Sequence, residues 1–118
     1  MPITVGWNSN PQVTRIMRNF RDERYSGNAV SISGWTIKLI VKRLPTDSDD
    51  NALFDLTAQI VSPSTGTYRY NFTPDHTAIQ PGTYFAEERW WTSYAANKAP
   101  TDRRTESFVV QEPVQREL

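Results

Sequence analysis

The chain has few side chains of the kinds that catalyse reactions. It contains no cysteine, which excludes disulfides, zinc–thiolate sites and thiol nucleophiles. The only histidine, His76, follows Pro74 and Asp75, a setting typical of a surface helical turn and not of a catalytic base. One imidazole without cysteines does not make a metal site. We therefore expect no metal and no cofactor.

The carboxylates do not form an evident acid–base pair either. Glu87 and Glu88 are adjacent, so on a strand they point to opposite faces and cannot form the facing carboxylate pair of a glycosidase. The sequence also lacks a glycine-rich phosphate loop, a GxSxG motif and an HExxH motif. These observations indicate a protein that is not an enzyme.

One acidic stretch imitates the start of a calcium-binding loop. Asp47, Asp49 and Asn51 have the spacing of its first three ligands. However, Ala52 replaces the required glycine, and Ala58 replaces the closing glutamate. The stretch is therefore interpreted as a solvated hairpin tip between two strands.

The four tryptophans are more than a core of this size obviously needs. Trp90 and Trp91 are adjacent, followed by Tyr94, so on a regular strand one of the two rings should face outward. An outward ring fits two functions: stacking on sugar rings, as in a carbohydrate-binding module, or packing at a subunit contact. Trp7 lies in a terminal segment, where it either covers the edge of its own core or contacts a partner.

The charge of the chain is balanced, with thirteen basic and thirteen acidic residues. A neutral protein gains no long-range attraction to nucleic acid or to an anionic membrane, although arginines cluster at 15, 18, 21, 24, 103 and 104. No run approaches the roughly 20 apolar residues that span a bilayer, and no secretory leader is recognised. We therefore expect no nucleic-acid or membrane partner and a protein made inside a cell.

The stretch that positions these residues runs from Thr67 to Trp91. Its first part alternates polar and aromatic residues up to Thr73, the period of a half-buried strand. Thr73 as N-cap, with Pro74 at the first helical position, predicts a short helical turn at residues 75–79. Pro81 and Gly82 then reverse the chain, and a second strand begins at Thr83.

Shorter strand patterns fill the rest of the chain. Alternation predicts strands at residues 29–32, 35–43, 52–61 and 103–111, whereas residues 12–21 are compatible with a helix or a strand. Residues 1–11 are interpreted as an extended arm and residues 112–118 as a flexible tail. The predicted core consists of Trp35, Ile37, Leu39, Val41, Phe54, Leu56, Ile60, Tyr68, Tyr70, Phe72, Phe108 and Val110.

These elements add up to an all-β fold. About seven short strands at regular spacing, separated by turn signals, describe an antiparallel β-sandwich of immunoglobulin type over residues 12–111. The connection from Asp75 to Tyr84 is similar to the corner at which such sandwiches hydrogen-bond a tyrosine hydroxyl back to the chain. Ala86 stands where antibody domains place a cysteine.

Five short motifs occur in a characteristic order along the chain. They are a D-x-x-x-x-G turn at Asp22 to Gly27, a small apolar strand ending in Ser-Gly at Val30 to Gly34, an alternating strand at Trp35 to Val41, the run Gly66 to Thr73, and the Pro-Gly-x-Tyr of Pro81 to Tyr84. As an ordered set, the motifs resemble the small immunoglobulin-like domains of tailed-phage virion proteins, such as the N-terminal domains of baseplate and tail-fibre attachment proteins.

The resemblance carries three implications. The segment at residues 12–21 would be a strand, because the family opens with one. The protein would be a non-enzymatic building block of a virion that docks, in several copies, onto a tail, baseplate, neck or capsid ring, with copies of itself and other virion proteins as partners. As a protein that acts through contacts, it would use its candidate surface aromatics, Trp7, Trp90, Trp91 and Tyr94, although the last three lie in a stretch where the chain departs from the family pattern; sugar binding through the surface tryptophans is the alternative.

Overall fold

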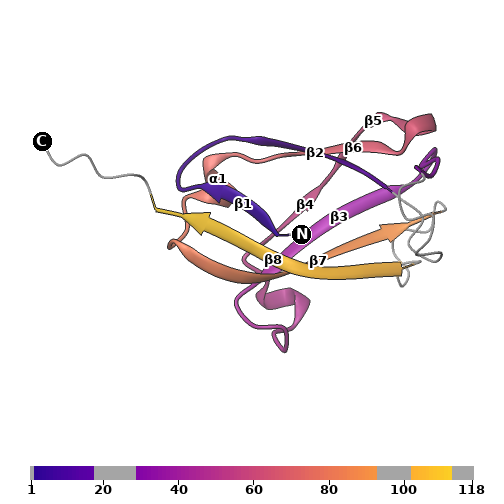
Figure 1. Ribbon diagram of the computed structural model, residues 1–118. Coiled ribbons are helices and arrows are strands. Elements are labelled where there is room, and N and C mark those ends of the chain that lie inside the picture. The colour runs from indigo at the N-terminus through magenta and orange to yellow at the C-terminus, as the bar shows by residue number, and fades with distance from the viewer. Residues whose placement is uncertain (1, 18–28, 93–101, 113–118) are drawn as a thin grey trace, which may run out of the picture.

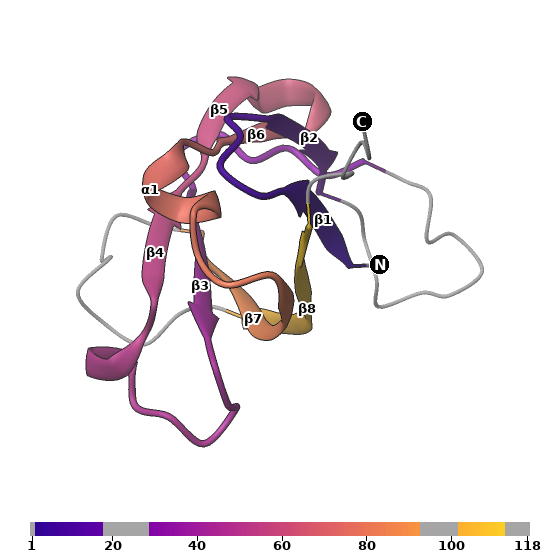
Figure 2. The ribbon, with the colours of Figure 1, turned by 90° about the vertical axis from the view of Figure 1, so that its left-hand side faces the viewer.

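The computed structural model describes residues 2–17, 29–92 and 102–112. These residues form two β-sheets packed face to face, with one short α-helix at one end (Figures 1 and 2). The all-β prediction is therefore confirmed. The predicted turn at residues 22–27, Tyr94 and residues 113–118 of the predicted tail lie outside the described residues.

The larger sheet has five strands in the order β1-β8-β7-β3-β4, and the smaller has three in the order β2-β6-β5. All pairings are antiparallel except β1 with β8, which is parallel. The strands are β1 (Ile3–Gly6), β2 (Gln12–Ile16), β3 (Thr36–Lys42), β4 (Phe54–Thr57), β5 (Gln59–Ser62), β6 (Thr67–Asn71), β7 (Gly82–Trp91) and β8 (Asp102–Gln111). The helical elements are η2 (Asp49–Asn51), η3 (Pro63–Thr65) and α1 (Pro74–Thr77).

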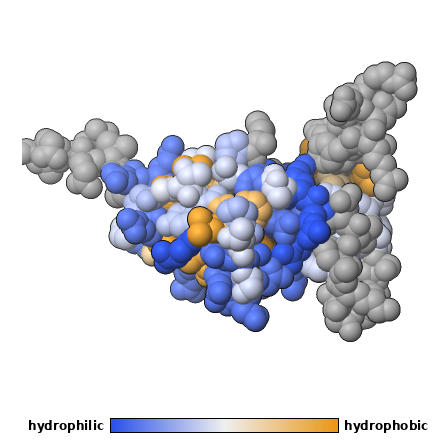
Figure 3. Space-filling view, turned by 90° about the horizontal axis from the view of Figure 1, so that it is seen from below, coloured by the Kyte–Doolittle hydropathy of each residue, from blue (hydrophilic) through white to orange (hydrophobic). Residues whose placement is uncertain are grey.

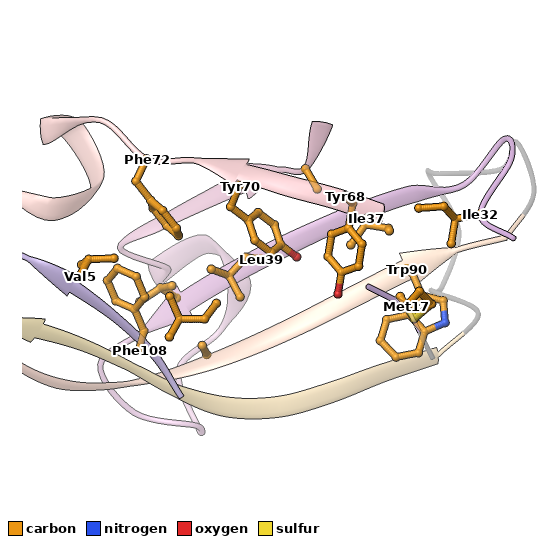
Figure 4. Packing of buried hydrophobic residues seen from close by; sticks show 14 of the residues in the cluster. Val5, Met17, Ile32, Ile37, Leu39, Tyr68, Tyr70, Phe72, Trp90 and Phe108 are labelled. Carbon is orange, nitrogen blue, oxygen red and sulfur yellow. The ribbon is translucent and has the colours of Figure 1, made fainter. Parts of the chain in front are cut away.

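The core lies between the two sheets, where alternate residues of each strand meet. The aromatic residues of β6 and the segment after it project from the small sheet toward the large sheet, where β3 presents aliphatic side chains (Figure 4). Four of the predicted core residues, Trp35, Phe54, Leu56 and Ile60, are partly buried and pack against the cluster. The other eight, Ile37, Leu39, Val41, Tyr68, Tyr70, Phe72, Phe108 and Val110, are buried.

The segment predicted as an unpaired arm is in part a strand of the large sheet. Ile3 to Gly6 pair with Phe108 to Gln111, and the side chains of Ile3 and Val5 are buried. The alternation Ile-Thr-Val places both aliphatic side chains on the core face. The prediction missed this strand because it is four residues long and is followed by a polar, turn-rich stretch.

The single strand predicted at residues 52–61 is two strands in different sheets. Phe54–Thr57 pairs with β3, Gln59–Ser62 pairs with β6, and the chain crosses at Ala58, whose N–H still donates to the carbonyl of Ile37 at 2.8 Å. The strand predicted at residues 29–32 is not formed, so the described residues form eight strands where about seven were predicted, and the sandwich is not wholly antiparallel. Alternation continues through Ala58, so the sequence pattern does not reveal the crossing.

The predicted helical turn is present as α1, four residues long. Thr73 precedes it as N-cap, Pro74 occupies the first helical position, and the backbone N–H of Thr73 donates a hydrogen bond to Nδ1 of His76 at 3.0 Å. This reciprocal arrangement is a capping box, with a histidine ring nitrogen in place of the usual glutamate or glutamine. The helix therefore ends the β6 strand at a fixed angle.

Gly66 closes the turn between β5 and β6 at a crowded point. Its φ angle is +73°, and a Cβ at this position would lie 2.5 Å from the carbonyl oxygen of Val30 and 3.0 Å from that of Met17. Gly34 has a similar φ of +77°, but a Cβ there would meet no atom within 4 Å. A side chain at Gly34 would therefore cause backbone strain alone, whereas a side chain at Gly66 would cause the same strain and a steric clash.

We expect Gly66→Ala to lower the free energy of unfolding by about 2–5 kcal/mol, because left-handed strain and a backbone clash add together. Gly34→Ala is the matched control and should cost about 1–2 kcal/mol, from strain alone. Urea denaturation followed by tryptophan fluorescence measures both. Equal losses would mean that the close approach of residues 17, 30 and 66 does not constrain the fold.

Candidate functional site

Trp7 is the predicted contact residue that the structure leaves at the surface. The residue is 41% exposed, while its backbone N–H donates a hydrogen bond to the backbone carbonyl of Gln111 at 3.0 Å. The next residue, Asn8, has a positive φ of 57° and donates its N–H to the carbonyl of Thr77 at 3.1 Å. Ser9 and the buried Thr77 exchange two more hydrogen bonds. The turn that carries Trp7 is therefore fixed to both β8 and α1.

Trp90 and Trp91 lie on opposite faces of β7, as predicted, but the ring on the outer side is buried and not accessible. Trp90 is 9% exposed, on the core side, with the guanidinium carbon of Arg104 6.0 Å from its ring centroid. Trp91 is 8% exposed on the outer side, with Lys38 Nζ 5.9 Å from its ring. Alternation predicts the side of a sheet on which a ring lies, not whether other residues cover that side.

A buried carboxylate links the two sheets. Glu88, on β7, is fully buried and accepts hydrogen bonds from the hydroxyls of Tyr68 and Tyr70 at 2.9 and 2.6 Å. Figure 4 shows both hydroxyls directed from β6 toward the opposite sheet. Arg104 and Arg15 complete the shell, with nitrogen atoms 2.5 and 3.3 Å from the carboxylate. Glu88 is therefore held from β2, β6 and β8 at once.

Arg15 extends this cluster to a second carboxylate. Its two terminal nitrogens donate to the two oxygens of Glu106 at 2.7 and 2.6 Å, a bidentate geometry that favours arginine over lysine. Burial alone would lower the pKa of Arg15, but the hydrogen bond with Glu106 and the charge of Glu88 outweigh it and raise the pKa. The guanidinium thus stays charged between two acidic side chains.

The tyrosines of this cluster are held in the neutral form. Burial, followed by the charge of Glu88, raises the pKa of Tyr68 and Tyr70 above the usual range. Both hydroxyls consequently remain donors at every physiological pH. Since Glu88 is surrounded by donors, the cluster has the geometry of a structural link between sheets and not that of a proton-transfer site.

Sequence reasoning missed the cluster, although one signal for it was present. Glu88 has the same parity along the strand as Tyr84, Ala86 and Trp90, so alternation places it on the core face. A carboxylate at such a position requires buried partners. Those partners come from strands far away in the sequence, and only the fold identifies them.

A second charged network lies on the outer face of the large sheet and fixes the loop between β3 and β4. The carboxylate of Asp49 contacts Arg89 at 2.8 and 2.9 Å and Lys42 Nζ at 2.8 Å, and Arg89 also contacts Glu87 at 2.6 Å. Hydrogen bonds from Arg89 and then from Lys42 hold the pKa of Asp49 well below its usual range. Lys42, whose side chain points to the outer face of β3, is therefore buried under this loop.

The tyrosine corner residues lie at the α1 end of the sandwich. The hydroxyl of Tyr84 donates to the backbone carbonyl of Gln80, four residues earlier. Asp75, the other predicted corner residue, is exposed in the first turn of α1. The hydroxyl bond therefore ties the start of β7 to the connection that follows α1.

The chain matches no known protein family and no curated protein. Within residues 2–17, 29–92 and 102–112, no three histidine, cysteine or acidic side chains are grouped so that they could hold a metal ion. In the same residues, no helix has the length and apolar character needed to cross a membrane.

We expect Glu88→Gln to lower the free energy of unfolding by about 3–5 kcal/mol, because Arg104 loses the carboxylate that it contacts and Arg15 keeps only Glu106. Glu87→Gln is the matched control: the same change one residue earlier, also at a buried side chain, should cost less than about 2 kcal/mol, because Arg89 keeps its bidentate contact with Asp49. Urea denaturation at neutral pH measures both changes. Equal losses would contradict a special role for the inter-sheet carboxylate.

The single histidine predicts a pH dependence of stability. Burial lowers the pKa of His76 below its ordinary value of 6.5, against a smaller opposite effect of Asp75. Between the folded and the unfolded pKa of His76, the folded state therefore binds fewer protons than the unfolded state. The contribution of His76 to stability is fully present above pH 6.5 and is lost as the pH falls to the lower folded pKa. We expect the urea concentration at half-unfolding to decrease as the pH is lowered from about 7 to about 5.

His76→Gln provides the control for this pH dependence. Glutamine at this position can accept the hydrogen bond from the Thr73 N–H, as in the common capping box, but does not titrate. The variant should therefore have a flatter profile over the same pH range, measured by denaturation midpoints in a pH series. If the midpoint of the variant changed with pH as steeply as that of the wild type, the pH dependence of stability would come from the carboxylates and not from His76.

Proposed function

We propose that this chain is an immunoglobulin-like, non-enzymatic assembly module of a tailed-phage particle, associated with its tail, baseplate, neck or capsid. It acts by protein–protein contacts with other virion proteins and with copies of itself. The exposed, rigidly held Trp7 is the observation that carries the proposal.

The strand order supports the immunoglobulin-like part. In chain order, β2 to β8 correspond to strands B, C, C′, D, E, F and G, because β2-β6-β5 matches B-E-D and β8-β7-β3-β4 matches G-F-C-C′. The hydroxyl of Tyr84 bonds to the chain near the start of β7, where such domains have their tyrosine corner. The ordered sequence motifs support the phage assignment independently.

The setting of Trp7 supports the contact function. Exposed tryptophans are enriched among the residues that dominate protein interfaces, and a side chain whose backbone is already ordered loses less entropy on binding. The Trp7 turn is bonded to β8 and α1, so its backbone is ordered before any partner arrives. Among the described tryptophans, only Trp7 is exposed.

The sugar-binding alternative depended on an outward Trp90 or Trp91. Because both rings are covered, neither offers a flat, accessible platform for a sugar ring. No observation on the described residues favours that alternative over protein contact, and it is not proposed further.

The test uses purified particles of the phage that encodes the chain. Mass spectrometry should detect the wild-type chain in the particles, and Trp7→Ala should reduce its copy number by about tenfold or more, as expected when an interface anchor worth ~1.4 kcal/mol or more is lost. The unfolding temperature of the isolated variant should stay close to that of the wild type, since the ring is exposed.

Val61→Ala is the matched control, because Val61 is also 41% exposed but lies on the small sheet. This variant should enter particles at the wild-type level. Particles that lack the wild-type chain would contradict the assembly function, whereas wild-type incorporation of Trp7→Ala would contradict the role of Trp7.

A further inference from the structure

Thr77 of α1 holds the Trp7 turn, residues 7–9, through three hydrogen bonds. Its carbonyl oxygen accepts the backbone N–H of Asn8 at 3.1 Å, and its hydroxyl oxygen accepts that of Ser9 at 2.8 Å. The same hydroxyl donates to the backbone carbonyl of Ser9 at 2.5 Å. Figures 1 and 2 show the chain between β1 and β2 beside α1. The order of the turn therefore depends on the position of Thr77.

The position of Thr77 depends in turn on the capping box of α1. The helix has four residues, so it has little stability of its own. Its first turn is closed by Thr73, whose carbonyl accepts the N–H of Thr77 at 3.1 Å and whose N–H donates to Nδ1 of His76 at 3.0 Å. Because His76 directly precedes Thr77, loss of the cap acts on the residue that binds the turn.

The cap requires a neutral imidazole ring. Since the N–H of Thr73 donates to Nδ1 of His76, that nitrogen carries no proton, and the single ring proton is on Nε2. A second proton adds at Nδ1. Two N–H groups then face each other, and the hydrogen bond between Thr73 and His76 is lost. Protonation of the ring therefore opposes the capped helix.

The surroundings of the ring do not favour its protonated form. Phe54 of β4 and Phe72, which follows β6, pack against it with ring centroids 4.9 and 6.0 Å away. Asp55 follows Phe54 and lies on the opposite face of β4. The charge that acts on the ring is that of Asp75 on α1 itself. Burial outweighs this charge and lowers the pKa of His76 below its ordinary value of 6.5.

The charged network on the outer face of the large sheet responds to a different pH range. Figure 3 views this face from below and shows hydrophilic surface around an apolar centre. Hydrogen bonds from Arg89 and Lys42 hold the pKa of Asp49 well below its usual range. Asp49 therefore keeps its charge between about pH 7 and about pH 5, and the loop between β3 and β4 stays fixed while His76 titrates.

We propose that the protonation state of His76 controls the order of the Trp7 turn. With a neutral ring, α1 is capped, and Thr77 holds Asn8 and Ser9. With a protonated ring, α1 opens and releases both residues, so the backbone of Trp7 is no longer ordered before a partner binds. The inference rests on the proposed assembly function, because it describes the regulation of the contact that Trp7 makes.

Native-state hydrogen exchange of the full chain, followed by NMR at about pH 7 and about pH 5, tests the inference. The amides of Asn8 and Ser9 report on the turn, and that of Ala78, which donates to the carbonyl of Pro74 at 2.8 Å, reports on α1. After correction for intrinsic exchange rates, all three protection factors should fall by about three- to thirtyfold at the lower pH, the effect of losing a helix cap.

The amide of Ala58, which donates to the carbonyl of Ile37 in the large sheet, is the reference for global unfolding. Because the opening of α1 is local, Asn8 and Ser9 should be less protected than Ala58 at both pH values. Equal protection would mean that the turn is released only when the whole domain unfolds, and it would overturn the inference.

Two variants at one position separate the acceptor from the charge. His76→Gln keeps an acceptor for the N–H of Thr73 and does not titrate, so the protection of Asn8 and Ser9 should be the same at both pH values. His76→Lys carries a positive charge and no acceptor, so their protection should be low at both pH values. A wild type whose turn amides do not respond to pH, or an equal response in His76→Gln, would overturn the inference.

Purified phage particles test the consequence for the contact. After a wash at about pH 5, particles should lose at least about threefold more of the wild-type chain than of His76→Gln, because the turn is released only in the wild type. Equal retention overturns the regulation by His76 and leaves the assembly function standing. Particles that never contain the chain overturn the proposed function, and the exchange measurement still decides whether His76 controls the turn.

Discussion

The sandwich depends on a carboxylate that has been removed from water. Glu88 occupies a core position on β7, where a charge is costly unless it is paired and hydrogen-bonded. Tyr68 and Tyr70 supply two donors from the small sheet, while Arg104 and Arg15 supply positive charge from β8 and β2. Since these groups come from both sheets, satisfying Glu88 requires the sheets to pack in one relative position. Apolar side chains alone would tolerate small shifts that this cluster does not.

The Glu88 cluster lies where β1 no longer pairs with β8. That strand pairs only with residues 108–111 of β8, so no described strand flanks β8 on that side at residues 102–107. At this level Arg15 of β2 contacts Glu106 of β8 and joins the two layers. A bidentate arginine–carboxylate pair has a fixed geometry, so it can hold the edges of two sheets at a defined distance. Toward the α1 end, Ile3 and Val5 of β1 cover the core by hydrophobic packing instead.

Alternation was sufficient to predict which residues point into the core from β3, β6 and β8, because a period of two needs no knowledge of the partner strand. It could not reveal the crossing at Ala58, where the same period runs through two sheets, nor the burial of Trp91, which depends on what lies over the outer face. The partners of Glu88 were also beyond it, since Arg15 is 73 residues away in the chain. What the sequence pattern omits is therefore long-range: the order of strands, the coverage of faces and the pairing of charges.

The neutrality of the chain acquires a different meaning once the pairs are known. Two clusters, Arg15, Arg104, Glu88 and Glu106 between the sheets and Lys42, Arg89, Asp49 and Glu87 on the outer face, are each neutral within themselves. The paired charges contribute little to the long-range field, so the remaining acidic and basic residues determine how the surface meets other molecules. On the outer face of the large sheet, the exposed Arg103 also contacts Glu87, at 3.7 Å. The balance of charge in the sequence thus has a structural basis, because these acidic and basic side chains meet partners of opposite sign within the fold.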